Sequence, residues 1–193
     1  MLRGEIDSGV WAVSYLLSMY TCAPKDFVLG QPAVAEVDGV TVGLGELSKR
    51  TCYMDKTHYP LFRSKASVRR LIERGLRKTH LTLSGVPLTV DDVCDMFRLD
   101  DERSRRRISR GGSEALFSMA AVGYAHGRDI FCYPWYSVLR FNCFQYRLYY
   151  TFELFEQLGL TAIVPVGLGE IDDEGRNYFK VEIPYESDSC KNE

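Results

Sequence analysis

Apolar residues recur along the chain with two spacings, that of a helix face and that of a buried or half-buried strand. Helical spacing predicts helices over residues 10–20, 68–81, 91–99, 116–124 and 140–159. Short apolar runs beside turn residues predict strands over residues 129–133, 161–165 and 178–183, and Asp38-Gly39 predicts a hairpin turn. Helices that alternate with short strands are typical of an α/β sandwich.

Paired glycines stand in the middle of the chain, at Gly111 and Gly112. They free the backbone just before a helix that Ser109 or Ser113 can cap. That helix has one face of small residues, and the buried strand that follows it stops before Pro134. A small-residue helix leading into a buried strand fits a sheet that helices cover.

The order of these parts resembles the ATPase domain of ABC transporters, a family of the P-loop NTPase superfamily. The family's serine-glycine-glycine signature matches Ser109, Gly111 and Gly112, with Arg110 as an insertion. Its phosphate loop and the helix after it match residues 3–20, where Ser14 falls on the metal-binding hydroxyl. A plain buried or amphipathic helix is the preferred interpretation of that segment, because it lacks the lysine and most of the glycines of a phosphate loop.

The resemblance implies an α/β fold, a three-layer P-loop NTPase or ABC ATPase-like sandwich that is truncated at its N-terminus. It implies further strands at residues 27–30 and 51–54. The expected organisation is a single domain over residues 1–185, with a small helical insert at 67–110 and a disordered tail at 186–193.

The chain departs from the family at the positions that carry its chemistry. Five functional positions differ: Val13 stands for the lysine, Lys56 for the glutamine, Pro134 for the aspartate, Trp135 for the glutamate and Gly167 for the histidine. Loss of the acidic pair should remove metal-assisted phosphoryl transfer. The chain is therefore expected not to be an enzyme, and no catalytic residue is assigned.

Three hypotheses for the function follow. The first is a catalytically degenerate ABC ATPase-like domain that acts as a non-hydrolysing interaction or regulatory subunit, without ATP, Mg²⁺ or another cofactor. The second is an ATP-binding subunit of an ABC-type transporter, whose remaining signature completes a partner's nucleotide site. Its candidate nucleotide-binding residues are Ser14, Ser109, Gly111 and Gly112. The third is an unrelated α/β enzyme, although no Ser/His/Asp order or Cys–His pair supports one.

A basic run precedes the paired glycines, and it includes Arg105, Arg106, Arg107 and Arg110. Arginines beside a helix N-terminus form an anion patch, which is one interpretation. The other is a solvated connector whose charges are balanced by the acidic residues at 100–102. The sequence leaves both open.

Residues 131–155 are rich in aromatic side chains. Phe141, Phe144, Leu148, Phe152 and Phe155 follow helical spacing and form a core face. The remaining aromatic residues can belong to the core too, or to a surface for a homodimer or a protein partner: Trp135, Tyr136, Tyr146, Tyr149 and Tyr150.

Composition excludes some classes of partner. A formal net charge of −2 gives no reason to expect nucleic-acid binding. The six cysteines are scattered without metal-ligand spacing, which favours a reducing, cytoplasmic setting, and His58 is interpreted as a solvated loop residue, so no metal site is expected. No apolar run reaches the roughly 18 residues that span a bilayer, so membrane association is expected only through a transporter partner.

Overall fold

The computed structural model describes residues 1–3, 10–19, 34–37, 40–108, 114–171 and 181–182. The helices in this part of the chain are α1 (Val10–Met19), α2 (Leu44–Arg50), the short 3₁₀ helix η3 (Pro60–Arg63), α3 (Val68–Thr79), α4 (Val90–Met96), α5 (Asp101–Arg105), α6 (Ala115–Ala125) and α7 (Val138–Gln157). The strands are β1 (Leu2–Arg3), β2 (Val34–Val37), β3 (Val40–Gly43), β4 (Thr51–Tyr53), β5 (Thr82–Leu83), β6 (Val86–Pro87), β7 (Ile130–Cys132), β8 (Thr161–Ile163), β9 (Pro165–Val166) and β10 (Val181–Glu182).

Parallel strands form the centre of the molecule. One group has the order β4-β7-β8 and the other has the order β10-β1-β9, and every neighbouring pair in both is parallel. The two groups join because β9 follows β8 after a single residue, Val164. All of these strands therefore direct their carboxyl ends toward the same edge.

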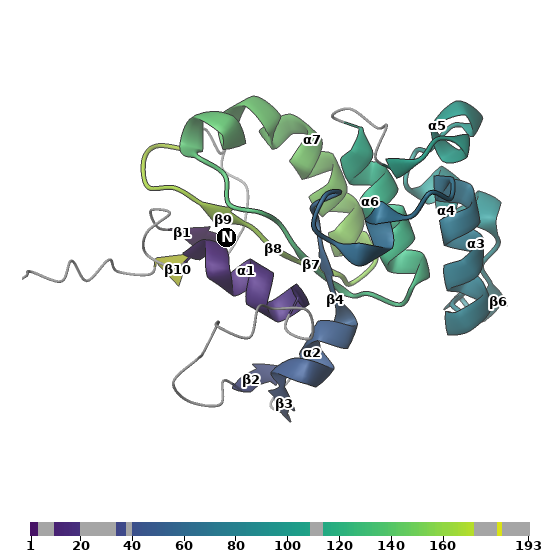
Figure 1. Ribbon diagram of the computed structural model, residues 1–193, viewed down its shortest axis with the longest axis horizontal. Coiled ribbons are helices and arrows are strands. Elements are labelled where there is room, and N and C mark those ends of the chain that lie inside the picture. Colours follow the sequence, from purple (N-terminus) through teal and green to yellow (C-terminus); the bar gives the residue numbers. More distant parts are fainter. Residues whose placement is uncertain (4–9, 20–33, 38–39, 109–113, 172–180, 183–193) are drawn as a thin grey trace, which may run out of the picture.

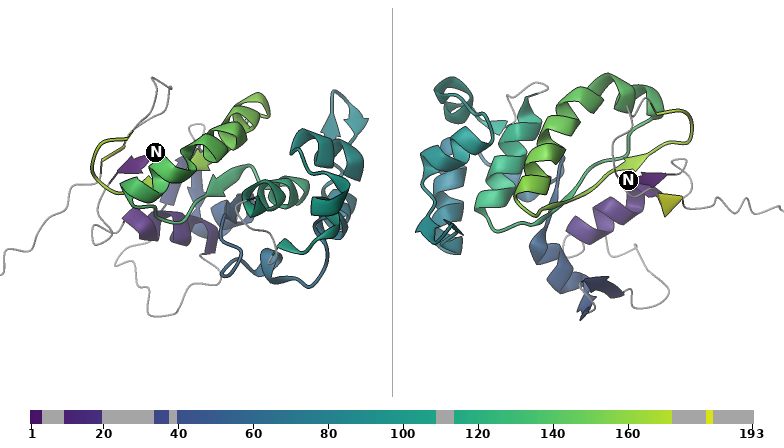
Figure 2. Two further views of the ribbon diagram at one scale, coloured as in Figure 1. Left: turned by 90° about the horizontal axis from the view of Figure 1, so that it is seen from above. Right: turned by 180° about the vertical axis from the view of Figure 1, so that it is seen from behind.

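Helices cover both faces of this sheet (Figures 1 and 2). On one face α1 packs through Tyr15, whose ring meets that of Tyr53 edge to face with centroids 5.7 Å apart. On the other face Phe131 stacks on Phe155 of α7 at 4.4 Å and lies against Gly123 of α6. Strand residues alternate between the two faces, so the predicted three-layer α/β sandwich is confirmed.

Local sequence explains where several helices begin. The side chains of Ser67, Thr89 and Ser137 each accept a hydrogen bond from a backbone N–H in the first turn of α3, α4 and α7. The Thr89 cap is reinforced by Asp92, which accepts a hydrogen bond from the Thr89 backbone N–H at 2.8 Å. The helices predicted from residues 68 and 91 are therefore present as α3 and α4, and α7 begins two residues earlier than its spacing indicated.

Other expectations meet the structure less directly. The hairpin around Asp38-Gly39 is present as the antiparallel pair β2 and β3, although its turn residues lie outside the described part of the chain. The strand expected at residues 27–30 and the cap expected at Ser109 or Ser113 also lie outside it. The first described residue before α6 is Glu114, whose side chain makes no capping hydrogen bond.

Three helices, α3, α4 and α5, lie beside the sandwich rather than on the sheet, on the right in Figure 1. Val68, Leu71 and Ile72 of α3 are buried, as their spacing predicted. Gly75 of α3 faces α6 so closely that a Cβ built there would lie 2.7 Å from the backbone carbonyl carbon and oxygen of Ala125. The two helices can approach this far only because residue 75 has no side chain.

Hydrogen bonds fix the same contact. Thr79 donates its hydroxyl proton to the carbonyl oxygen of Ala125, with an oxygen–oxygen distance of 3.0 Å. The Nε2 atom of His126 lies 3.1 Å from the carbonyl oxygen of Leu71, and a carbonyl only accepts, so Nε2 carries the proton. The end of α6 is therefore bonded to two turns of α3.

Stability is expected to fall as the pH is lowered from 7.5 toward 5. Burial lowers the pKa of His126, the hydrogen bond to Leu71 opposes that change, and the nearby cations Arg128 and Lys78 add to it. The unfolded chain therefore takes up the proton first, and the stability contributed by neutral His126 is lost as the pH falls through the lowered folded-state pKa. Urea titrations at several pH values measure this, and His126→Gln should flatten the change. An equally steep loss in that variant would contradict the assignment to His126.

Candidate functional site

The edge where the parallel strands end is the candidate site, because ligands of α/β proteins bind beyond the carboxyl ends of the strands. Pairing with β8 and β9 continues past the end of β7. The Tyr133 backbone N–H donates to the Ile163 carbonyl oxygen at 2.8 Å, and the Tyr136 N–H donates to the Pro165 carbonyl oxygen at 3.0 Å. The Gly167 N–H then donates to the Tyr136 carbonyl oxygen at 2.9 Å. The segment after β7 is thereby held along the sheet.

Trp135 and Gly167 lie against each other at this edge. A Cβ built on Gly167 would lie 3.2 Å from Cζ2 of the Trp135 indole, which is closer than most Cβ contacts. Trp135 is half-buried and the Gly167 position is buried. The ABC resemblance assigns position 135 to the catalytic glutamate and position 167 to the switch histidine. Here Trp135 places an indole ring at the first, and Gly167 leaves room for that ring because it has no side chain.

Aromatic rings also occupy the neighbouring strand ends. Tyr136 is buried, and the guanidinium carbon of Arg140 lies 5.5 Å from its ring centroid, within range of a cation–π contact. Burial raises the pKa of Tyr136 to about 12, while Arg140 opposes the shift and Asp55 adds to it. Burial likewise raises the pKa of Tyr53 at the end of β4, and Asp55 and Tyr136 add to that shift. Both phenols are neutral at physiological pH and cannot act as proton acceptors there.

The loop after β4 is shaped by Asp55. Its Oδ1 atom accepts hydrogen bonds from the Thr57 backbone N–H at 2.7 Å and from the His58 backbone N–H at 3.1 Å. Burial opposes ionisation of Asp55, but these bonds and those from the Thr57 and His58 side chains outweigh it and lower the pKa of the carboxyl group. His58 is exposed, and its Nδ1 atom lies 3.2 Å from the Asp55 carboxylate. The carboxylate therefore orders the turn.

The helix that matches the family's phosphate-loop segment places its residues inward. Ser14 of α1 is fully buried, and its hydroxyl has no hydrogen-bond partner among the described residues. Val13 is partly buried. The other proposed nucleotide-contacting positions, Ser109, Gly111 and Gly112, lie outside the described residues. The helix predicted over residues 10–20 is present as α1, and both interpretations of this segment include it.

Two arginines of the basic run form ion pairs with carboxylates one turn away. Arg105 pairs with Asp101 at 3.0 Å, and Arg106 pairs with Glu102 across one turn. Arg107 is exposed, and Arg110 lies outside the described part of the chain. Carboxylates that neutralise two of the four arginines favour the solvated connector over the anion patch.

The proposed interface residues separate into core and surface. Tyr136 and Tyr149 are 6% and 7% exposed, so of the two alternatives that the sequence left open they belong to the core. Tyr149 packs edge to face on Phe141 and Phe152, which makes it part of the core face of α7. Tyr146 is 67% exposed, and Tyr150 is half-buried beneath Arg98, whose guanidinium carbon lies 4.9 Å from its ring centroid.

One residue at this edge was missed from the sequence. Arg3 ends β1, is 6% exposed, and donates from Nη2 to the Gly169 carbonyl oxygen at 2.5 Å. An arginine two residues from the chain start carries no pattern that predicts burial. Its bond joins the end of β1 to the segment after β9.

Groups of three or more histidine, cysteine or carboxylate residues able to hold a metal ion are absent from the described residues. Within the same ranges, no helix is both long and apolar enough to cross a bilayer.

Comparisons with known proteins find a likeness in structure but none in sequence. No family profile and no curated protein sequence matches the chain. Among solved structures, the chain is similar to the dimeric structure of a post-hydrolysis state of the ATP-binding cassette MJ0796 bound to ADP and Pi. The two chains are 14% identical, with a TM-score of 0.49, over 87% of this chain and 73% of that chain.

Proposed function

We propose that this chain is a catalytically degenerate ABC ATPase-like domain that acts as a non-hydrolysing interaction or regulatory subunit. The contact between Trp135 and Gly167 carries the proposal. In the ABC resemblance, the residues at these two positions would activate water and bind the terminal phosphate. Here the Trp135 indole lies against Gly167 instead. A hydrolytic site needs a carboxylate and a proton-handling group there, and neither residue supplies one.

The burial of Ser14 in α1 supports the same proposal. A metal-binding hydroxyl must face the ligand, whereas the Ser14 side chain is fully buried. The alternative of an ATP-binding subunit needs Ser14 at the ligand, and no described contact favours it. The free thiols of Cys52, Cys94, Cys132 and Cys143 support a reducing, cytoplasmic setting for this function.

An exposed stripe on α7 supports the interaction half of the proposal. Leu139 is 77% exposed, Cys143 is exposed, Tyr146 is 67% exposed and Tyr150 is half-buried. These residues follow one another at spacings of four, three and four, which is the spacing of a seam between two helices. The ring of Tyr146 meets that of Tyr150 edge to face at 4.9 Å, so the aromatic part of the stripe is continuous. The stripe fits the same helix of a second copy.

The purified chain is expected to be a homodimer in light scattering. Leu139→Ser combined with Tyr146→Ser should shift it to a monomer, because the change removes two large exposed side chains of the stripe. The matched control is Leu83→Ser combined with Val86→Ser on the β5-β6 hairpin. The wild-type side chains of Leu83 and Val86 are 49% and 66% exposed. A wild-type chain that is monomeric at its highest soluble concentration, or a control that dissociates equally, would contradict the pairing through α7.

A further inference from the structure

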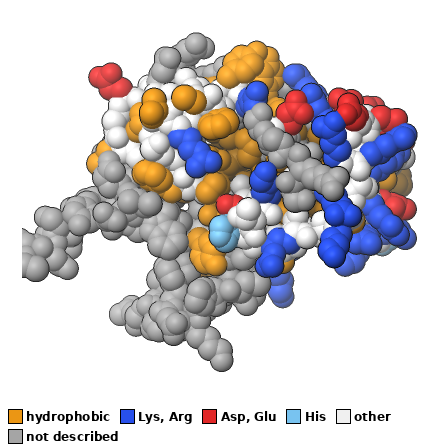
Figure 3. Space-filling model, turned by 45° about the horizontal axis from the view of Figure 1, so that its top comes forward, with side chains coloured by type: hydrophobic (Ala, Val, Ile, Leu, Met, Phe, Trp, Pro, Cys, Tyr) orange, Lys and Arg blue, Asp and Glu red, His pale blue; other side chains and the backbone are white. Residues whose placement is uncertain are grey.

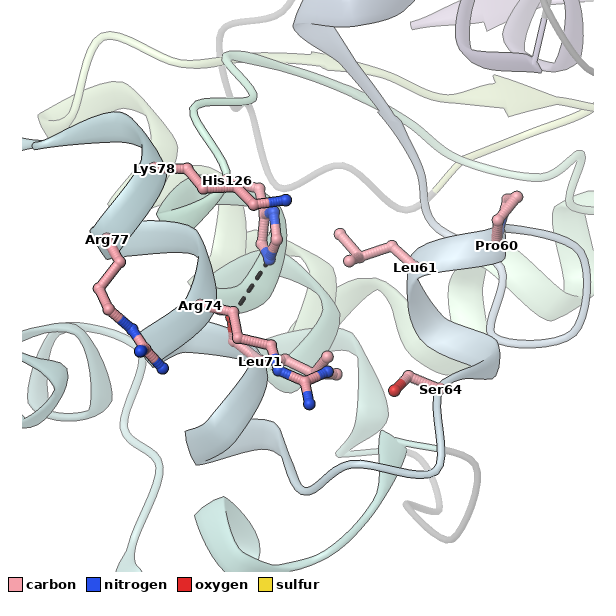
Figure 4. A pocket seen from close by; sticks show the side chains of 8 residues that line it. All are labelled: Pro60, Leu61, Ser64, Leu71, Arg74, Arg77, Lys78 and His126. Atoms are coloured by element: carbon pink, nitrogen blue, oxygen red, sulfur yellow. Dashed lines mark hydrogen bonds between the residues drawn. The ribbon is translucent and has the colours of Figure 1, made fainter.

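A pocket opens between η3 and α3, away from the candidate site at the sheet edge (Figure 4). Its volume is about 610 Å³, within the range of roughly 300–1,000 Å³ that is typical of small-molecule sites. Eight residues line it: Pro60, Leu61, Ser64, Leu71, Arg74, Arg77, Lys78 and His126. The pocket therefore draws its walls from η3, the residue after it, α3 and the end of α6.

One wall of the pocket is cationic. Arg74, Arg77 and Lys78 occupy positions i, i+3 and i+4 of α3, so they lie on one side of the helix, and all are exposed. Arg74 and Lys78 form no ion pair with any described residue, and Arg77 has Glu73 at 3.4 Å. None of the described residues that line the pocket is a carboxylate. Figure 3 shows the wider pattern, in which basic side chains gather over the helices beside the sandwich.

Part of this charge has an ordinary structural cause. Arg77 and Lys78 stand in the last turn of α3, where cations interact favourably with the helix carboxyl end. Arg74 stands one turn earlier and gains nothing comparable there. His126 adds no charge at neutral pH, because burial lowers its pKa and its Nε2 proton is held by Leu71. Arg74 is therefore the cation that helix stability explains least.

The opposite wall is apolar. Pro60 and Leu61 of η3 line it, and Leu61 points toward α3 (Figure 4). Leu71 adds an apolar side chain from α3 itself, and Ser64 lines the pocket after η3. A site with three cations on one wall and apolar side chains on the other suits a ligand with an anionic group and an apolar or planar body. Guanidinium forks match phosphate oxygens, and the lysine ammonium adds a point charge.

We propose that this pocket binds an organic phosphate, with the phosphate between Arg74, Arg77 and Lys78 and the body against Pro60 and Leu61. The proposal does not depend on the function assigned to the sheet edge, because it uses none of the residues there. The phosphate can belong to a free small molecule or to a lipid headgroup, since the chemistry that recognises both is the same.

Isothermal titration calorimetry at 100 mM NaCl tests the proposal, with phenyl phosphate and inorganic phosphate as probes. Saturable binding is expected for phenyl phosphate, and weaker binding for inorganic phosphate, which has no body to contact Pro60 and Leu61. Arg74→Gln combined with Lys78→Gln should weaken phenyl phosphate binding by at least about tenfold, because charge-assisted hydrogen bonds are lost. Co-sedimentation with phosphatidylcholine vesicles containing phosphatidic acid forms the lipid arm, and binding there that needs the same two residues assigns the phosphate to a headgroup.

The matched control removes the same charge elsewhere, through Arg70→Gln combined with Lys49→Gln, two exposed residues that do not line the pocket. Binding should stay within twofold of the wild type in this control. Equal weakening in both double variants would show attraction by net charge alone and would overturn the proposal. Absence of binding in both arms, or binding only to an acidic peptide, would overturn it as well. All replaced side chains are exposed, so circular dichroism should show the variants folded.

Discussion

Replacing Gly75 by alanine is expected to lower the free energy of unfolding by about 2–3 kcal/mol. Helix propensity alone predicts the opposite sign, because alanine is better than glycine in a helix interior by about 1 kcal/mol. Packing should prevail, since the new Cβ would lie 2.7 Å from backbone atoms of Ala125, and a backbone cannot rotate out of the way. Helices α3 and α6 would have to separate, and the hydrogen bonds from Thr79 and His126 would lengthen.

Thermal unfolding measures this effect, and a chain of this size should lose roughly 4–12 °C in melting temperature. The matched control is Gly45→Ala in α2, where a new Cβ meets no atom within 4 Å. It should leave stability unchanged or raise it by up to about 1 kcal/mol. If both variants gain stability alike, α3 and α6 are not packed as closely as described.

A second large effect is expected where Trp135 meets Gly167. Gly167→His should cost about 1–3 kcal/mol of stability, because the imidazole must displace the indole from a contact already at 3.2 Å. In the Trp135→Ala background that clash is absent. The double variant should therefore lose about 0.5–3 kcal/mol less unfolding free energy than the two single variants lose in total.

The cycle is measured by urea unfolding of the wild type, the two single variants and the double variant. Gly43→His provides the control, because a Cβ at Gly43 has no atom within 4 Å and should show no coupling to Trp135. Additive changes at Trp135 and Gly167 would mean that the indole does not occupy the space above Gly167. The structural basis of the proposed function would then be lost.

The sequence predicted the sandwich because its helices and strands differ clearly in pattern. The central strand was expected over residues 129–133 and is β7, Ile130–Cys132, with every residue buried. A strand that is buried on both faces is apolar whichever strands it pairs with. The apolar run therefore predicted a buried strand, but it could not predict parallel pairing with β4 and β8. The resemblance supplied the strand at residues 51–54, which is β4, but not its pairing with β7.

The directions of side chains on α7 were predicted only in part. Phe141, Leu148 and Phe155 are buried as expected. Tyr149 was assigned to another face, yet the apolar stripe of a core helix is often wider than 100°, and Tyr149 falls inside it. Tyr146 lies roughly opposite Phe141 on the helix, and for that reason it stays exposed.

The pocket beside α3 could have been found in the sequence only in part. Arg74, Arg77 and Lys78 stand at spacings that place them on one side of a helix, and such a pattern usually marks a solvated face. Only the fold brings Pro60 and Leu61 opposite them. Contacts between segments that are distant in the chain, such as Trp135 with Gly167, have no local pattern at all.

Phosphate release from MgATP by the purified chain is the most direct test of the central claim, that this domain does not hydrolyse nucleotide. We expect no magnesium-dependent release above background, because Trp135 and Gly167 supply neither a carboxylate nor a proton-handling side chain. Ser14→Ala, assayed in parallel, should give the same background rate. Release that requires magnesium, exceeds background and disappears in Ser14→Ala would contradict the account.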